Sequence, residues 1–118
     1  MEPAALTPFL QSLQGPVAND NLPISVEEVG ENWLAACRRR GLERASLLQY
    51  EQHLKYHINP LIGPLYLLDL TTPIVQKFAD KLVQSRGPAM AKKALASLKS
   101  LLTEAQRLGY VRDNVATP

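Results

Sequence analysis

The stretch HLKYHINPLIGPLYLLDLTTP, residues 53–73, interrupts a chain that otherwise has the periodicity of helices. It begins on a helical pattern, reaches Pro60 and then Gly63-Pro64, and restarts at Thr72-Pro73. Proline lacks a backbone N–H and glycine weakens helices, so this punctuation predicts the end of one helix at residues 60–64. The segment LIGPLYLLDL is too apolar for a solvated loop. We therefore expect it to pack over the core as an ordered connection.

The sequence before this stretch predicts a sharply bounded first helix. In SVEE, Ser25 is expected to be the N-cap and Glu28 its partner three residues later, which is the capping-box pattern. Apolar residues follow at helical spacing, and Trp33 and Cys37 among them are expected to be packed in the core. Gly41 is the predicted C-terminal stop.

A second helix is predicted to begin at SLLQ, with Ser46 as N-cap and Gln49 as its partner at the third helical position. Its inward face includes Tyr50, whose hydroxyl is expected at the rim of the core. The third helix is predicted to restart with Thr72 as its cap and Pro73 in the first helical position. The RGP break at 86–88 then leads into the fourth and longest helix, which Gly109 stops. The result is four helices around one core.

Composition places the chain among ordinary single-domain globular proteins. It has 118 residues, 46% of them hydrophobic and 20% charged. No apolar run approaches the roughly 18 residues of a membrane-spanning helix, and the first residues lack the pattern of a signal peptide. A cytoplasmic protein without membrane association is therefore the expectation. Cys37 is the single cysteine, which excludes an intrachain disulfide framework and a cysteine metal cluster.

The net charge of +2 is unevenly distributed. Residues 1–71 are acidic on balance, whereas the basic surplus lies in the predicted third and fourth helices, residues 72–108. Clustered positive charge on two helices indicates an anionic partner.

These motifs, in this order, resemble the core-binding domain of the tyrosine recombinases, the phage-integrase family. The resemblance covers about residues 25–116. It rests on SVEEVGENWL, the Ser46-x-x-x-Tyr50 pair, HINPLIG, LLDLTTPIVQKF and ALASLKSLLTEAQRLGYVRDNVA. It implies an all-α, compact four-to-five-helix bundle of the SAM-like type, which forms half of a clamp around double-stranded DNA.

The resemblance also sets the expected domain organisation. Residues 1–24, rich in proline and polar residues, are expected to be a disordered N-terminal arm. Residues 25–116 would form the DNA-binding domain, and residues 117–118 would begin the linker to a catalytic domain. The expected partners are duplex DNA, that C-terminal catalytic domain and other recombinase protomers. The protein would be bacterial or phage-encoded and associated with the nucleoid when bound.

Catalysis is not expected from these residues. The family's catalytic domain carries two arginines, a lysine, histidines and a tyrosine nucleophile, whereas this chain has no His-x-x-Arg motif and its four tyrosines all fall within the helical domain. Neither a nucleophile–base pair nor a phosphate loop is evident, and no cofactor is expected. His53 and His57 have the i, i+4 spacing of metal ligands but lack a third ligand, so we expect no metal site.

DNA contacts are predicted on the fourth helix and at the start of the second. On the fourth helix, two lysines alternate with Ala96 and Thr103 along one stripe, so cations could neutralise phosphates while small residues allow close approach. The start of the second helix offers free N–H groups to a phosphate. The alternative interpretation of these residues is a solvated helix face and a structural cap. The predicted contacts are Arg44, Ser46, Gln49, Lys92, Lys93, Lys99, Thr103 and Arg107, with Lys93 and Arg107 the more peripheral.

A different class of function is also open at this point. The bundle could be a protein–protein interaction module, such as a recombinase assembly factor or decoy. Leu48, Val83 and Leu101 would then form an apolar patch for the partner.

Overall fold

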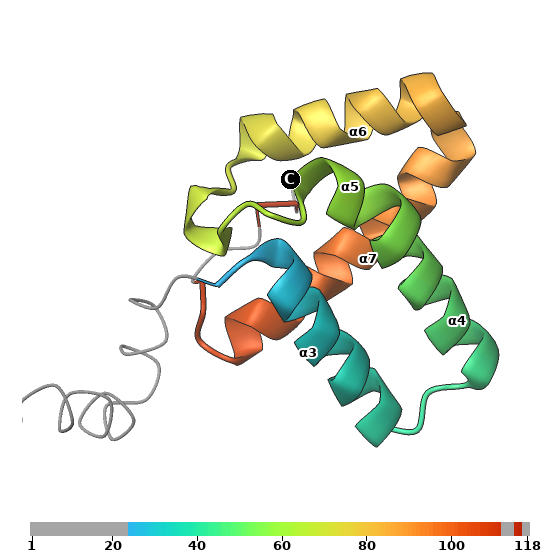
Figure 1. The fold of residues 1–118 in the computed structure, drawn as a ribbon, viewed down its shortest axis with the longest axis vertical. Helices are drawn as coiled ribbons and strands as arrows, with labels where there is room; N and C mark the ends of the chain where they lie inside the picture. The colour runs from blue at the N-terminus through green and yellow to red at the C-terminus, as the bar shows by residue number, and fades with distance from the viewer. Residues whose placement is uncertain (1–23, 112–114, 117–118) are drawn as a thin grey trace, which may run out of the picture.

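The computed structural model describes residues 24–111 and 115–116, and within them the regular structure is helical apart from one isolated antiparallel bridge between Ser25 and Tyr66. Four helical segments pack around one core (Figure 1). The predicted all-α bundle is therefore confirmed. Nearly all of the predicted arm, residues 1–23, lies outside the described residues, as do residues 117–118.

Helix α3 (Val26–Arg39) begins at the predicted capping box. The Glu28 backbone N–H donates to Ser25 Oγ at 3.2 Å, and Glu28 Oε1 accepts from the Ser25 backbone N–H at 2.9 Å. The helix ends before Gly41, whose φ of 76° is a left-handed conformation that favours glycine. Both predicted boundary signals of this helix are confirmed.

Ser25→Ala should lower the free energy of unfolding by about 1 kcal/mol, because the alanine cannot accept the Glu28 N–H. Urea denaturation of both proteins measures the difference. Ser85→Ala is the matched control, since Ser85 is exposed and its hydroxyl donates to Lys81 O within its own helix. An equal loss in the two variants would contradict a capping role for Ser25.

Helix α4 (Arg44–His53) starts three residues earlier than the sequence predicts. Its N-cap is Glu43, no side chain caps it, and Ser46 lies inside the first turn. The predicted Ser46–Gln49 capping box is therefore wrong. The physical reason lies in the preceding turn: the half-buried Leu42 donates its N–H to Cys37 O at 3.2 Å, which anchors the turn and lets the helix start directly after it.

The helix continues past Pro60 and ends at Ile62, within the predicted range of residues 60–64. A π-helical turn (Leu54–Ile58) follows α4 and leads into α5 (Asn59–Ile62). The Asn59 N–H donates to Leu54 O, five residues back, so the helix is widened just before the proline. A widened turn accommodates a ring that would otherwise clash with the preceding turn. Of the two predicted breaks, Gly63-Pro64 is the one that ends the helix.

The connection after α5 caps the start of α3. The Val26 N–H donates to Leu65 O at 2.9 Å, the Glu27 N–H donates to Gly63 O at 3.0 Å, and the Leu67 N–H donates to Ile24 O at 2.8 Å. A 3₁₀ turn (Leu67–Asp69) follows, and Leu67 itself is buried. The predicted ordered connection is confirmed, and its backbone satisfies helix N–H groups that would otherwise lack partners.

Helices α6 (Thr72–Arg86) and α7 (Pro88–Arg107) complete the bundle. The cap of α6 is Thr71, whose Oγ1 accepts from the Ile74 N–H at 3.4 Å, so the predicted cap at Thr72 is wrong by one residue. Proline therefore occupies the second helical position. Gly87, with φ of 93°, makes the sharp turn between the two helices.

Helix α7 is the centre of the packing, since it contacts α3, α4, the π turn and α6. Its apolar side chains Leu98, Leu101 and Leu102 are almost completely buried together with Trp33 and Ile58. Leu101 is therefore a core residue, and the predicted apolar patch of Leu48, Val83 and Leu101 is wrong. Within the described ranges, no helix has both the length and the apolar character needed to cross a membrane.

Candidate nucleic-acid interface

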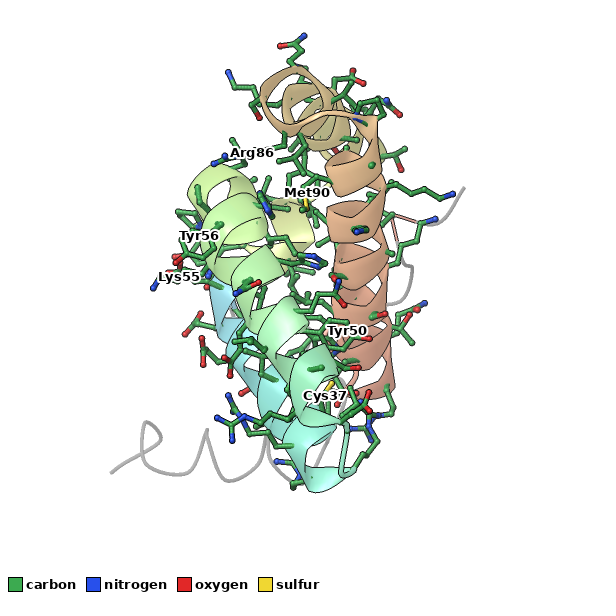
Figure 2. The ribbon with its side chains drawn as sticks, turned by 90° about the vertical axis from the view of Figure 1, so that its right-hand side faces the viewer. Cys37, Tyr50, Lys55, Tyr56, Arg86 and Met90 are labelled. Atoms are coloured by element: carbon green, nitrogen blue, oxygen red, sulfur yellow. The ribbon has the colours of Figure 1, made fainter. Side chains whose placement is uncertain are left out.

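Helices α4 and α7 lie side by side with one groove between them, and an adjoining groove lies between α7, Tyr50 of α4 and the C-terminal half of α3. Figure 2 shows Tyr50 between these helices, whereas Lys55 and Tyr56 lie on the far side of α4. The Tyr50 ring packs against Trp33 with centroids 4.7 Å apart, which confirms its predicted position at the rim of the core. Tyr50 and Ser100 line both grooves, which we call together the α4–α7 groove.

The two parts of the groove have different linings. The first part, of about 220 Å³, is lined by Gln49, Tyr50, His53, Lys93, Ala96, Ser97 and Ser100. The second part, of about 320 Å³, is lined by Trp33, Cys37, Arg40, Leu42, Tyr50, Ser100, Thr103, Glu104 and Arg107. The lining is thus polar and basic over an aromatic floor.

The structure gathers half of the predicted contact residues in this groove. Gln49, Lys93, Thr103 and Arg107 line it. Lys93, Ser100 and Arg107 are spaced by seven residues, so they follow one line along α7 on the side turned towards α4. Lys93 and Arg107 were predicted to be the more peripheral contacts, but they line the groove, whereas Lys92 and Lys99 do not.

The other predicted residues lie outside the groove lining. Lys92 and Lys99 also differ by seven residues, but they precede Lys93 and Ser100 by one and so lie about 100° further round α7. Arg44 and Ser46 belong to the first turn of α4, directly after Glu43. The carboxylate of Glu43 adds a negative charge at the helix end where a phosphate was expected.

A buried carboxylate organises the second part of the groove. Glu104 is only 4% exposed and accepts from Arg107 Nε at 3.2 Å as well as from Arg107 Nη2, while Arg40 Nη1 lies 3.8 Å away. The hydrogen bond from Arg107 holds the pKa of Glu104 below its ordinary value, although burial opposes this. Two arginines from different helices are therefore held at one site with a net positive charge.

Arg40 and Ser100 are groove residues that the sequence analysis did not select. Arg40 is one of three consecutive arginines, Arg38 to Arg40, at the end of a helix, and the sequence does not distinguish which of them faces a groove. Arg38 instead pairs with Glu51 at 2.7 Å. Ser100 could have been found from its spacing, because it follows Lys93 by seven residues and so lies on the same face of the helix.

His53 and His57 are both buried, and His53 links the end of α4 to α7. His53 Nδ1 and Ser97 Oγ form a hydrogen-bonded pair at 2.7 Å, and the two imidazole rings lie 6.1 Å apart. Burial lowers the pKa of His53, with smaller contributions from His57 and Lys93, and burial followed by Arg86 lowers the pKa of His57. Among residues 24–111 and 115–116, no three potential metal ligands form a cluster.

The lowered histidine pKa values predict acid sensitivity. The unfolded chain binds protons on these side chains as the pH falls through 6.5, whereas the folded domain resists protonation. The free energy of unfolding should therefore be constant above about pH 7.5 and fall as the pH is lowered below 6.5. Urea denaturation across pH 5 to 8, roughly the range in which histidine titrates, measures this slope. His53→Gln should flatten it, and an unchanged slope would contradict the assignment.

Comparison with known proteins supplies the family. Residues 25–83, half of the chain, match the family described as phage integrase, N-terminal SAM-like domain. The chain belongs to this family. The match spans α3 to most of α6, so α7 and its side of the groove lie beyond it. The sequence-based resemblance to the phage-integrase family is thereby confirmed.

A solved structure extends the likeness of this SAM-like domain to α7. The crystal structure of a lambda integrase dimer bound to a COC' core site aligns over 98% of this chain with a TM-score of 0.75 and 21% identity. The alignment covers 30% of that integrase chain. At this identity the likeness establishes the shared fold. A comparison with curated proteins gave no match.

Proposed function

We propose that this SAM-like domain is the core-type DNA-binding domain of a tyrosine recombinase and that it holds duplex DNA across the α4–α7 groove. The observation that carries the proposal is the basic lining of this groove, with Lys93 in its first part and Arg107 together with Arg40, the C-cap of α3, in its second part. Family membership supports a role in recombination. The solved lambda integrase is a dimer bound to a core site, which supports duplex DNA and other protomers as partners.

The groove chemistry suits a phosphate backbone. Exposed cations bind phosphates and release counterions, which supplies most of the affinity of a domain of this kind. Gln49, Ser100 and Thr103 add hydroxyl and amide groups that can hydrogen-bond to phosphate or base edges, and Ala96 leaves room for close approach. The hydrogen bonds to Glu104 hold Arg107 in one orientation, and the carboxylate offsets part of the positive charge of the arginine.

The remaining parts of the proposal concern the rest of the protein. The domain would be half of a clamp around DNA, while strand cleavage and the other half of the clamp belong to a separate catalytic domain. On its own the domain would bind weakly and without cleavage. The protein would act in a bacterial or phage-infected cytoplasm.

A salt series on labelled duplex DNA of random sequence tests the proposal. If about four of the predicted cations contact phosphates, the slope of log K against log salt concentration should be about −3 to −4. Binding should therefore be clear at about 50 mM salt and nearly lost at about 200 mM. Binding that is absent at low salt, or that does not change with salt, would contradict the proposal and favour a protein-interaction module.

A further inference from the structure

A second groove, between α5 and α6, is left unused by the proposed function. Its lining is mainly apolar: the buried Ile62 and Phe78 form the floor, with Leu61, Leu65 and Ile74 around them, and its volume is about 270 Å³. We call it the α5–α6 groove. It shares no lining residue with the α4–α7 groove.

Exposed apolar side chains are concentrated in the segment that carries the groove residues Leu61 and Leu65. Leu61, Tyr66 and Leu68 are 38%, 49% and 58% exposed, and all three lie in or just after α5. They make up half of the large apolar side chains that are exposed among the described residues. Such a concentration in one short segment indicates a covering partner.

The edge of the groove shows which charge that partner carries. Lys77 and Lys81, four residues apart on α6, both line it and are exposed. Neither forms an ion pair with a residue in the described part of the chain. The groove therefore suits an amphipathic segment with apolar residues on one face and a negative net charge.

We propose that residues 1–23 of the same chain occupy the α5–α6 groove. This segment has Glu2 and Asp20 but no lysine or arginine, so its side-chain charge is complementary to the two lysines. Its apolar residues Leu6, Phe9, Leu10 and Leu13 have the i, i+3, i+4, i+7 spacing of one helix face. Pro8 would fall in the first turn of such a helix, where proline is tolerated, and Gly15 is a stop signal after it.

The path of the chain favours this occupant over a separate protein. Ile24, the first described residue, accepts at its carbonyl from the Leu67 N–H at 2.8 Å, and Leu65, two residues before Leu67, lines the groove. The described chain therefore begins close to the groove. Ten residues separate Leu13 from Ile24 and can span about 35 Å when extended, which is ample for the required reach.

Protease protection of Phe9 tests this proposal on the full chain without DNA, so the result is independent of the proposed function. Chymotrypsin cleavage after Phe9, followed by mass spectrometry, is compared with cleavage of a synthetic peptide of residues 1–23. The chain should be cut more slowly than the peptide. The groove variant Leu61→Glu with Lys77→Glu should be cut about fivefold to tenfold faster than the unmodified chain, because cleavage follows the undocked population.

Leu48→Glu with Lys55→Glu is the matched control. Both of its positions are exposed, it makes the same two types of substitution with the same change in charge, and neither residue lines the α5–α6 groove. It should be cut at the rate of the unmodified chain, and circular dichroism verifies that all variants fold. In the segment itself, Leu6→Ala with Leu13→Ala should also increase the cleavage rate.

Three results would overturn the assignment. The first is cleavage of the unmodified chain at the rate of the peptide. The second is protection that the groove variant leaves unchanged, which would place the segment elsewhere. The third is protection that rises with protein concentration together with dimer formation in sedimentation, which would assign the groove to the segment of a second copy.

Discussion

Replacing Gly63 with alanine should lower the free energy of unfolding by about 2–3 kcal/mol. A Cβ at this position would lie 2.7 Å from both Cα and O of Asn59, and these backbone atoms cannot move away as a flexible side chain could. The strain would reach α3 as well, because Gly63 O accepts a hydrogen bond from the Glu27 N–H and so helps to cap the start of that helix. Urea denaturation monitored by circular dichroism measures the loss.

Gly41→Ala is the control for this substitution. Gly41 has φ of 76° but has no atom within 4 Å of the added Cβ, so alanine there costs only the left-handed conformation, about 1 kcal/mol. The two substitutions therefore differ in the backbone clash, which only Gly63→Ala introduces. Equal losses in the two variants would show that the turn at Gly63 relaxes without difficulty.

The double variant Gln49→Ala with Lys93→Ala should weaken binding of random duplex DNA by about 10- to 30-fold at low salt. These two side chains face each other across the first part of the α4–α7 groove, from α4 and α7. Removing the lysine should also make the salt slope shallower by about 1. Fluorescence anisotropy across a salt series gives both quantities. Within the described part of the chain neither side chain forms a hydrogen bond that the fold requires, so stability should change little.

Gln52→Ala with Lys55→Ala is the matched control for DNA binding. It removes the same two residue types from exposed positions, and Lys55 lies on the side of α4 away from α7 (Figure 2). Its affinity and salt slope should equal those of the unmodified domain. Equal losses in both double variants would show that general positive charge, rather than the groove, determines binding. A third double variant, Lys92→Ala with Lys99→Ala, measures how much the lysines outside the groove contribute to the DNA affinity.

Much of the fold could be predicted from local sequence signals. The Ser25–Glu28 box, the glycine at 41 and the break at 86–88 each act within a few residues, so their effect does not depend on the rest of the chain. The caps predicted at Ser46 and Thr72 failed because packing or an adjacent residue offered an alternative, whereas the helix end predicted at residues 60–64 is confirmed with Pro60 inside the helix. The anchored Leu42 turn starts α4 early, the π turn accommodates Pro60, and Thr71 caps α6 in place of its neighbour.

The candidate site was predictable in type but not in arrangement. The helical period alone predicted that cations seven residues apart line up along one face of α7, since this spacing aligns side chains in any helix. Which of the two lines, Lys92–Lys99 or Lys93–Ser100–Arg107, faces α4 depends on the rotation of α7 in the bundle. The core side chains Leu98, Leu101 and Leu102 fix that rotation by their burial.

The sequence by itself therefore determined the class of the protein, its helical segments and the basic character of its second half. Caps, breaks and apolar periods are local, and they need no knowledge of distant residues. Only the tertiary structure decided that the 63–67 connection caps α3, that Glu104 joins Arg40 to Arg107, and that an apolar groove opens beside Ile24. Each of these features joins residues far apart in the chain, and packing against a shared core brings them together.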